Sequence, residues 1–167
     1  VATGFNRNHR LNGEGGIKSG GKTYTLEVIA YDNKYNTADG TKVAQTLFTR
    51  DNVDFIVGAM GTGPTQALQS IAERRDKLIF TTAWGRSIKG PDHPLTFTQA
   101  HTSAESMPEL FAYIKQTNPN AKTVALVNPN DATGKAVEAD ARAFWTKIGI
   151  SVVMSDFFER DTTAFQS

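Results

Sequence analysis

Short apolar segments alternate with amphipathic segments along this 167-residue chain, and this alternation limits the possible fold more than any other feature. Val53–Ala59, Lys77–Thr82 and Thr123–Val127 are apolar runs of strand length. Pro64–Arg75 and Ala132–Ile148 instead repeat apolar residues at three and four positions, as on one face of a helix. Short apolar strands that alternate with helices are typical of parallel sheets covered on both faces. The sequence therefore predicts a doubly wound α/β fold.

The remaining segments extend the same order. Polar residues suited to helix capping precede the predicted helices: Asn36 or Thr37, Ser103 with Ser106, and Asp131. We predict strands over Thr23–Tyr31, Leu95–Gln99 and Ile150–Phe158, and helices over Thr37–Asp51 and Ser103–Thr117. Because a helix at Ser103 follows a strand directly and opens a second unit, we place a boundary between two lobes near residues 100–102. Lobe one is residues 1–100 and lobe two begins with residues 101–167.

Composition excludes several classes of function. Eighteen basic and seventeen acidic side chains give a net charge of +1, which does not fit a nucleic-acid-binding protein. The absence of cysteine excludes disulfides and thiolate sites, and His9, His93 and His101 lack the spacing of metal ligands. The sequence contains no catalytic motif, so we predict neither an enzyme nor a cofactor or metal site. No apolar run approaches the length of a membrane span, and Val1–Arg10 lacks the layout of a signal peptide.

The segment Gly16–Thr23 matches the phosphate-binding pattern G-x-x-x-x-G-K-[ST]. A phosphate-binding loop of this kind follows a buried strand and opens a helix whose amides hold the phosphates. Here the residues before Gly13 are polar, and Lys22 leads into an alternating strand pattern. We therefore interpret the segment as a flexible turn before an edge strand.

Three loops that follow predicted strands carry candidate ligand contacts, because open α/β sheets bind ligands at the carboxyl ends of their strands. Gly61–Thr65 has two glycines and free amides at a helix start, which suit an anion such as a carboxylate; a tight loop with Pro64 at the first helical position is equally compatible. Trp84 follows another strand end, where it either lines a pocket or only covers the loop. Asn128–Gly134 forms the corresponding junction in the second unit.

A series of segments resembles one known family in order and spacing. The segments are Asn12–Ile17, Tyr31–Asn33, Ile56–Gly58 with Thr65 and Gln66, and the run Asn130–Gly134 after the strand that ends at Val127. They resemble the leucine/isoleucine/valine-binding proteins, which are type I periplasmic solute receptors of ABC transporters. The resemblance implies a two-lobed type I fold, present here as an incomplete portion. Val1–Asn12 matches the family's first helix, so the first strand would precede Val1 and the rest of lobe two would follow Ser167.

The resemblance also implies which residues contact a ligand. Thr62 falls where the family's lobe-one hydroxyl binds an amino-acid carboxylate, in the loop that also contains Gly63. The family's second contact loop falls on Ala83, Trp84 and Gly85. Amino-acid binders of the family usually offer a small residue and then a hydroxyl there, whereas this chain offers an indole and no side-chain hydroxyl. The implied ligand-binding residues are Thr62, Gly63, Ala83, Trp84, Gly85, Tyr35 and Thr133.

Together these observations predict an exported periplasmic receptor, whose signal peptide is absent from this chain. It would deliver a small solute, such as an amino acid, an amide or an aromatic acid, to an ABC transporter permease. Two alternatives remain open. One is a ligand-sensing domain of a receptor or regulator, and the other is a nucleotide-using enzyme that depends on Gly16–Thr23.

Overall fold

The structure is a computed structural model that describes residues 12–165, and it divides the chain into two compact units, residues 1–32 and 33–167. The predicted match of Val1–Asn12 to a first helix lies, apart from its last residue, outside the described residues. The predicted division into lobes at residues 100–102 lies inside the second unit and remains a prediction.

The first unit is a two-stranded antiparallel hairpin of β1 (Ile17–Ser19) and β2 (Lys22–Tyr24). Gly20 and Gly21 form its turn with φ values of 55° and 74°, a region that favours glycine. The strand predicted over Thr23–Tyr31 is wrong beyond Tyr24, because no described strand pairs with the residues that follow. The Asn12 side chain instead bonds both backbone groups of Leu26, at 2.7 and 2.8 Å.

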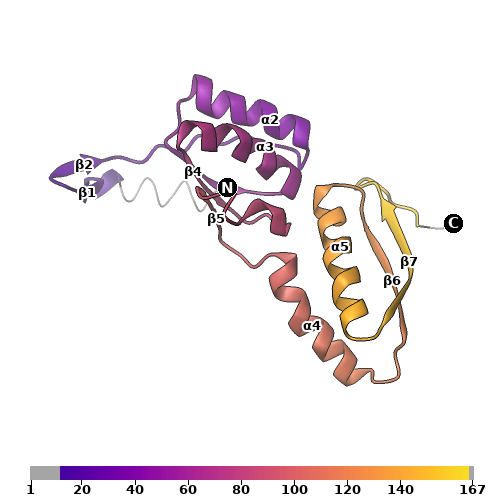
Figure 1. Ribbon diagram of the computed structural model, residues 1–167. Coiled ribbons are helices and arrows are strands. Elements are labelled where there is room, and N and C mark those ends of the chain that lie inside the picture. The colour runs from indigo at the N-terminus through magenta and orange to yellow at the C-terminus, as the bar shows by residue number, and fades with distance from the viewer. Residues whose placement is uncertain (1–11, 166–167) are drawn as a thin grey trace. The chain divides into compact units, whose positions relative to one another are not determined.

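A three-stranded parallel sheet begins the second unit, in the order β3 (Phe55–Ala59), β4 (Leu78–Thr81) and β5 (Thr96–Thr98). Two helices cross over beside it (Figure 1). They are α2 (Thr37–Gln45), which a π-helical turn extends through Thr46–Arg50, and α3 (Thr62–Ala72), which a 3-10 turn extends through Glu73–Arg75. Strand–helix alternation in this region is therefore confirmed.

One face of this sheet carries the core of the region. Buried apolar side chains from α2, its extension, β3, α3 and β4 form a single cluster: Ala44, Leu47, Phe48, Ile56, Ala59, Leu68, Ala72 and Ile79. The alternate residues of the strands point to the other face, where Phe55, Val57 and Phe97 are about half exposed or more. Phe80 and Phe97 stack there with ring centroids 5.7 Å apart. In the part of the chain described, helices thus cover only one face of this sheet.

The second parallel sheet pairs β6 (Thr123–Pro129) with β7 (Ser151–Phe158). Helices α4 (Ser103–Thr117) and α5 (Ala132–Lys147) pack against it. The core consists of Met107, Phe111, Leu126, Ala141, Trp145 and Ile150. The Phe111 and Trp145 rings stack within it, 3.9 Å apart and nearly parallel.

Helix capping follows the sequence except at α4. The Asn36 side chain accepts hydrogen bonds from the amides of Ala38 and Asp39, and Asp131 accepts one from the Gly134 amide, as predicted. The predicted cap at Ser103 is wrong by one residue. Thr102 occupies the cap position, and its amide donates to the Glu105 carboxylate at 2.8 Å. This frees the Ser103 hydroxyl for a contact elsewhere.

The α/β class with parallel sheets is confirmed. Among residues 12–165, no helix has the length and apolar character required to cross a membrane.

Removing the Trp145 ring is expected to destabilise the second core. Trp145 is 5% exposed and stacks on Phe111, so Trp145→Ala should lower the free energy of unfolding by about 3–5 kcal/mol. Tyr113→Ala is the control, because Tyr113 lies on the outer side of α4, 63% exposed, and should change stability by less than about 0.5 kcal/mol. Urea unfolding measures both, and equal effects of the two substitutions would contradict this account of the core.

Candidate functional site

Thr62 lies where β3 leads into α3. Strand β3 has an irregularity at Gly58, after which the chain turns through Gly61, with φ of 81°, into the first residue of the helix. The helix begins two residues before Pro64, earlier than predicted. Thr62 and Gly63 are both buried at this helix start.

The Thr62 hydroxyl and amide bind groups from two other predicted contact segments. Its hydroxyl oxygen accepts a hydrogen bond from the Gly85 amide at 3.0 Å and a second from the Thr133 hydroxyl at 3.0 Å. Its amide donates to the Thr133 hydroxyl oxygen at 3.1 Å. Thr62 is 1% exposed, so these bonds are shielded from water. The structure therefore brings together three predicted site residues that are far apart in the sequence.

Two glycines of the predicted site have no space for a side chain. A Cβ atom on Gly85 would lie 2.5 Å from Cγ2 of Thr62, and one on Gly63 would lie 2.2 Å from the Thr37 hydroxyl oxygen. Gly85 has an ordinary extended backbone, with φ of −67°, so contact and not conformation requires glycine there. Close approach of the loop to Thr62 depends on this missing side chain.

The Ala83–Gly85 loop is anchored through its backbone. Ala83 is buried, and its amide donates to the Thr81 hydroxyl at 3.0 Å. The Trp84 carbonyl accepts a hydrogen bond from the Ser103 amide at 2.9 Å. The Trp84 indole is 50% exposed, so its predicted role in lining a pocket remains a prediction.

Tyr35 reaches the same cluster from the loop before α2. Lys34 and Tyr35 both adopt left-handed backbone conformations, with φ of 51° and 54°, and the Tyr35 amide donates to the Asn33 side chain at 2.8 Å. Such conformations are costly for side-chain-bearing residues and concentrate at functional sites. The Tyr35 hydroxyl lies 3.4 Å from the Thr133 hydroxyl, and the Arg160 guanidinium lies 4.0 Å from the centre of the Tyr35 ring.

Sequence reasoning missed the charged residues around this cluster. Arg160 pairs with Asp131, the cap of α5. Arg86 lies 3.4 Å from the carboxylate of Asp140, which is 4% exposed. This carboxylate also accepts a hydrogen bond from the Ser103 hydroxyl at 2.6 Å. The sequence contained a signal for Asp140: it lies three residues after Val137 and four before Phe144, on the apolar face of its helix. A charged residue on that face indicates a buried charge with a partner.

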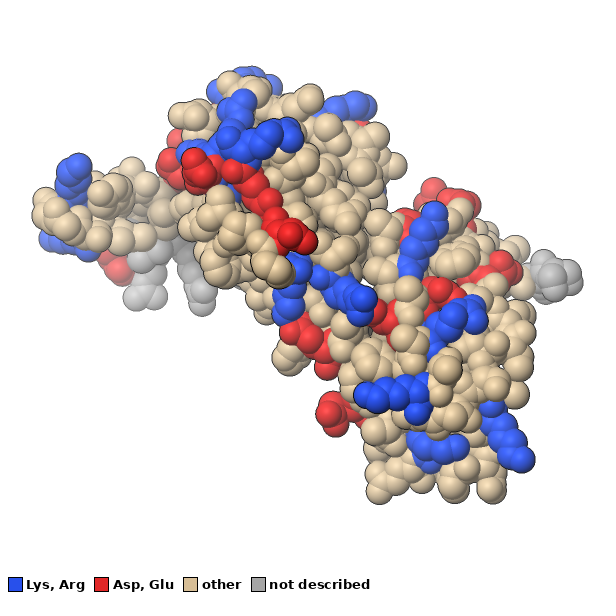
Figure 2. Space-filling view, viewed as in Figure 1, with Lys and Arg blue, Asp and Glu red and all other residues tan. Residues whose placement is uncertain are grey.

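Two carboxylates near the site, Glu105 and Glu138, have pKa values lowered by their immediate neighbours. The Lys89 ammonium, together with the Thr102 amide and hydroxyl, lowers the pKa of Glu105 to about 2. The Arg142 guanidinium likewise lowers the pKa of Glu138 on α5, aided by the Ser155 hydroxyl. Figure 2 shows basic and acidic side chains interspersed over the face in view. That face carries no extended patch of a single sign.

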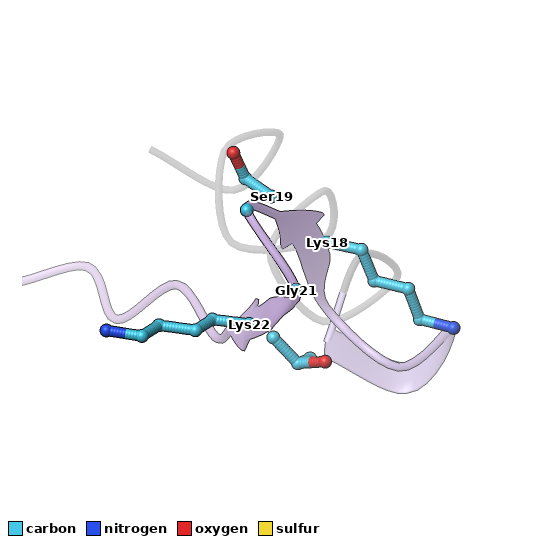
Figure 3. Close-up of a pocket in the computed structure, with 6 residues that line it drawn as sticks. Lys18, Ser19, Gly21 and Lys22 are labelled. Carbon is cyan, nitrogen blue, oxygen red and sulfur yellow. The ribbon is translucent and has the colours of Figure 1, made fainter.

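The structure does not support a phosphate-binding loop at Gly16–Thr23. The segment forms the β1–β2 hairpin and opens no helix. A shallow hollow is lined by Lys18–Thr23, but every residue in it is exposed, and the Lys18 and Lys22 side chains extend in opposite directions (Figure 3). This hairpin therefore lacks both the helix N-terminus and the converging lysines that would concentrate positive charge on a phosphate.

The described residues contain no group of acids and histidines arranged to hold a metal ion. His93 lies 3.2 Å from the Glu73 carboxylate, and His101 is exposed. His9 lies outside the described residues.

Adding a methyl group at Gly85 is expected to disrupt the contact with Thr62. Gly85→Ala should cost about 1–3 kcal/mol of stability through overpacking, measured by thermal unfolding. Thr62→Ala in the same chain removes the two closest atoms and should recover part of the loss. Gly13→Ala is the control, since its Cβ would meet nothing within 4 Å. No recovery in the double variant would contradict the proposed contact.

The Lys89–Glu105 pair is expected to stabilise the folded chain in a pH-dependent way. Because the folded-state pKa of Glu105 is lowered from 4.5 to about 2, its contribution is present above pH 4.5 and is lost as pH falls toward 2. Glu105→Gln should therefore lower the melting temperature at pH 7 but have little effect near pH 2. Because the pair is partly exposed, Glu105→Gln should lower the free energy of unfolding at pH 7 by about 1 kcal/mol or less. A penalty that stays constant across this range would contradict the assignment.

Comparison with known proteins identifies the family. Residues 7–167 match the family described as periplasmic binding protein. A periplasmic binding protein from Burkholderia mallei aligns with a TM-score of 0.78 at 20% identity, over 97% of this chain and 43% of that one. The branched-chain amino acid transporter substrate-binding protein from Streptococcus pneumoniae, in complex with isoleucine, gives 0.74 at 23% identity, over 95% and 44%. A solute-binding protein of an ABC transporter from Rhodopseudomonas palustris, in complex with 3,4-dihydroxybenzoic acid, gives 0.72 at 22%, over 93% and 41%.

This chain thus spans less than half the length of the solved structures that it matches. At these identities the structures show a shared fold, and the family match covers nearly the whole chain. The chain therefore belongs to the type I periplasmic binding protein family, as its resemblance to the leucine/isoleucine/valine-binding proteins predicted.

Proposed function

We propose that the protein is an exported solute receptor that captures a small molecule and delivers it to an ABC transporter permease. The family match supports a solute-binding role. The observation that carries the proposal is the meeting of Thr62 and Thr133, which lie in the first turns of helices on opposite sides of the predicted lobe boundary. A ligand held between these helix starts would contact both lobes at once.

The chemistry of Thr62 favours a ligand with an oxygen acceptor. The Thr62 amide is at the positive end of α3, where helix amides lack helical partners and favour an anion. The Thr133 hydroxyl oxygen now accepts from this amide, and it occupies the place that a ligand oxygen would take when the lobes part. The Gly85 amide occupies one lone pair of the Thr62 hydroxyl and so orients it. A carboxylate that replaces Thr133 would receive hydrogen bonds from both the amide and the hydroxyl.

The second contact loop bears on the rest of the ligand. Its Ala83–Gly85 segment offers no side-chain hydroxyl, and the half-exposed Trp84 indole supplies an aromatic surface. The ligands of two similar structures, isoleucine and 3,4-dihydroxybenzoic acid, each carry a carboxylate. We infer an amino acid, an amide or an aromatic acid, with Tyr35, Gly63 and Thr133 as further lining residues.

The proposed mechanism is capture of the solute between two lobes. Lobe one binds the solute first through Thr62, lobe two closes by a hinge motion, and the permease receives the closed form. No chemical step is required of any residue, so we propose a periplasmic binder and not an enzyme.

Solute binding is tested by thermal shift on the full-length protein with amino acids, amides and aromatic acids. A binding solute at a hundred times its Kd should stabilise the protein by about 2.7 kcal/mol. Thr62→Val should weaken its binding at least about tenfold, since it removes a hydrogen bond to a charged group, and Thr62→Ser should retain binding. Calorimetry measures both variants. Stabilisation by none of these solutes, or normal binding by Thr62→Val, would overturn the proposal.

A further inference from the structure

Asp140 is a buried carboxylate for which the proposed capture of solute has no direct use. It lies on α5 at 4% exposure, and it is the only charged residue among the buried residues of the part described. Burying a carboxylate is costly unless both of its oxygens find partners. The identity of those partners therefore indicates what Asp140 stabilises.

The two oxygens of Asp140 bind groups on different elements. Oδ2 accepts from the Ser103 hydroxyl at 2.6 Å, and Ser103 is itself fully buried at the start of α4. Oδ1 lies 3.4 Å from Nη1 of Arg86, which begins a 3-10 turn at Arg86–Ile88. The Ser103 bond joins α4 to α5. The Arg86 contact instead reaches back to the predicted ligand loop.

The loop between Ala83 and Lys89 is held from both sides. Toward α3, the Gly85 amide donates to the Thr62 hydroxyl. Toward α4, the Trp84 carbonyl accepts from the Ser103 amide, and Lys89 pairs with Glu105. Arg86, which pairs with Asp140, lies between these attachments along the chain. The same short segment is therefore bonded to both sides of the predicted lobe boundary.

We propose that Arg86, Ser103 and Asp140 form a latch that positions the Trp84 loop. Asp140 is the positioning residue of this latch, because its buried charge holds Arg86 one residue after the Gly85 amide that orients Thr62. The latch holds the loop where its Gly85 amide orients the Thr62 hydroxyl, and it thereby slows release of a solute bound by that hydroxyl. The loop-positioning part stands on the geometry alone, and the effect on solute release rests on the proposed function.

Amide hydrogen exchange of the full-length protein tests the positioning role without a ligand. Asp140→Asn keeps the shape and the Ser103 bond but removes the charge that holds Arg86. Exchange of the Ser103 amide and of residues 83–89 should accelerate at least about threefold. Glu138→Gln is the matched control on the same helix, because Glu138 bonds Arg142 and Ser155 and does not contact the loop. Its loop exchange should equal that of the unmodified protein.

A double-variant cycle separates the latch from a general loss of stability. Arg86→Gln should accelerate loop exchange as much as Asp140→Asn does, and the double variant should exchange no faster than either single variant. Unchanged exchange in Asp140→Asn, equal acceleration by Glu138→Gln, or additive effects in the double variant would each overturn the proposal.

Solute release is measured with 3,4-dihydroxybenzoic acid and isoleucine as probes, which are the ligands of two structurally similar proteins. For a probe that binds the unmodified protein, Asp140→Asn should weaken affinity mainly through faster dissociation, with little change in association rate. An unchanged dissociation rate would overturn the effect on release. If neither probe nor any screened solute binds, the proposed function fails, and the exchange experiment still decides whether the latch exists.

Discussion

The bonds around the Thr62 side chain are the constraint on which the candidate site depends. The hydroxyl of this buried threonine accepts hydrogen bonds from the Gly85 amide and from the Thr133 hydroxyl, and its amide donates one to the Thr133 hydroxyl oxygen. These bonds link the ends of β3 and β4 with the start of α5, three positions that the chain reaches through separate strand–helix units. In a low-dielectric interior such a network is strong when it is complete and costly when it is broken. The fold therefore concentrates its polar connections where the parallel strands end.

The fold was largely predictable because its signals are local. Apolar runs and helical spacing identified the parallel strands and helices of the second unit, and Asn36 and Asp131 marked two helix starts. The prediction failed at Thr23–Tyr31, because alternation shows that a segment can be a strand but does not supply a partner strand. At α4 it chose Ser103 over Thr102, since adjacent hydroxyl residues have similar capping preference and only the Glu105 contact distinguishes them.

The places of the candidate residues in the fold were predictable, but the contacts between them were not. The rule that ligand loops follow parallel strands placed Thr62, Trp84 and Thr133 correctly at strand ends. It could not show that Thr62 and Thr133 bond to each other, because the two are separated by 71 residues. Asp140 and Arg86 were missed for the same reason: their contact depends on how α5 packs beside the loop. Long-range pairs of this kind follow from tertiary packing and leave only weak marks in a single sequence.

The tight fit between Gly85 and Thr62 also limits how the protein can evolve. A residue with any side chain at position 85 would collide with Thr62, even though the backbone there tolerates every amino acid. A descendant could therefore acquire a side chain at position 85 only after position 62 had lost both its methyl group and its hydroxyl, and that first step would give up the hydrogen bond from Gly85. The two positions are therefore expected to be epistatic, so the order of substitutions decides whether position 85 can gain a side chain by single steps.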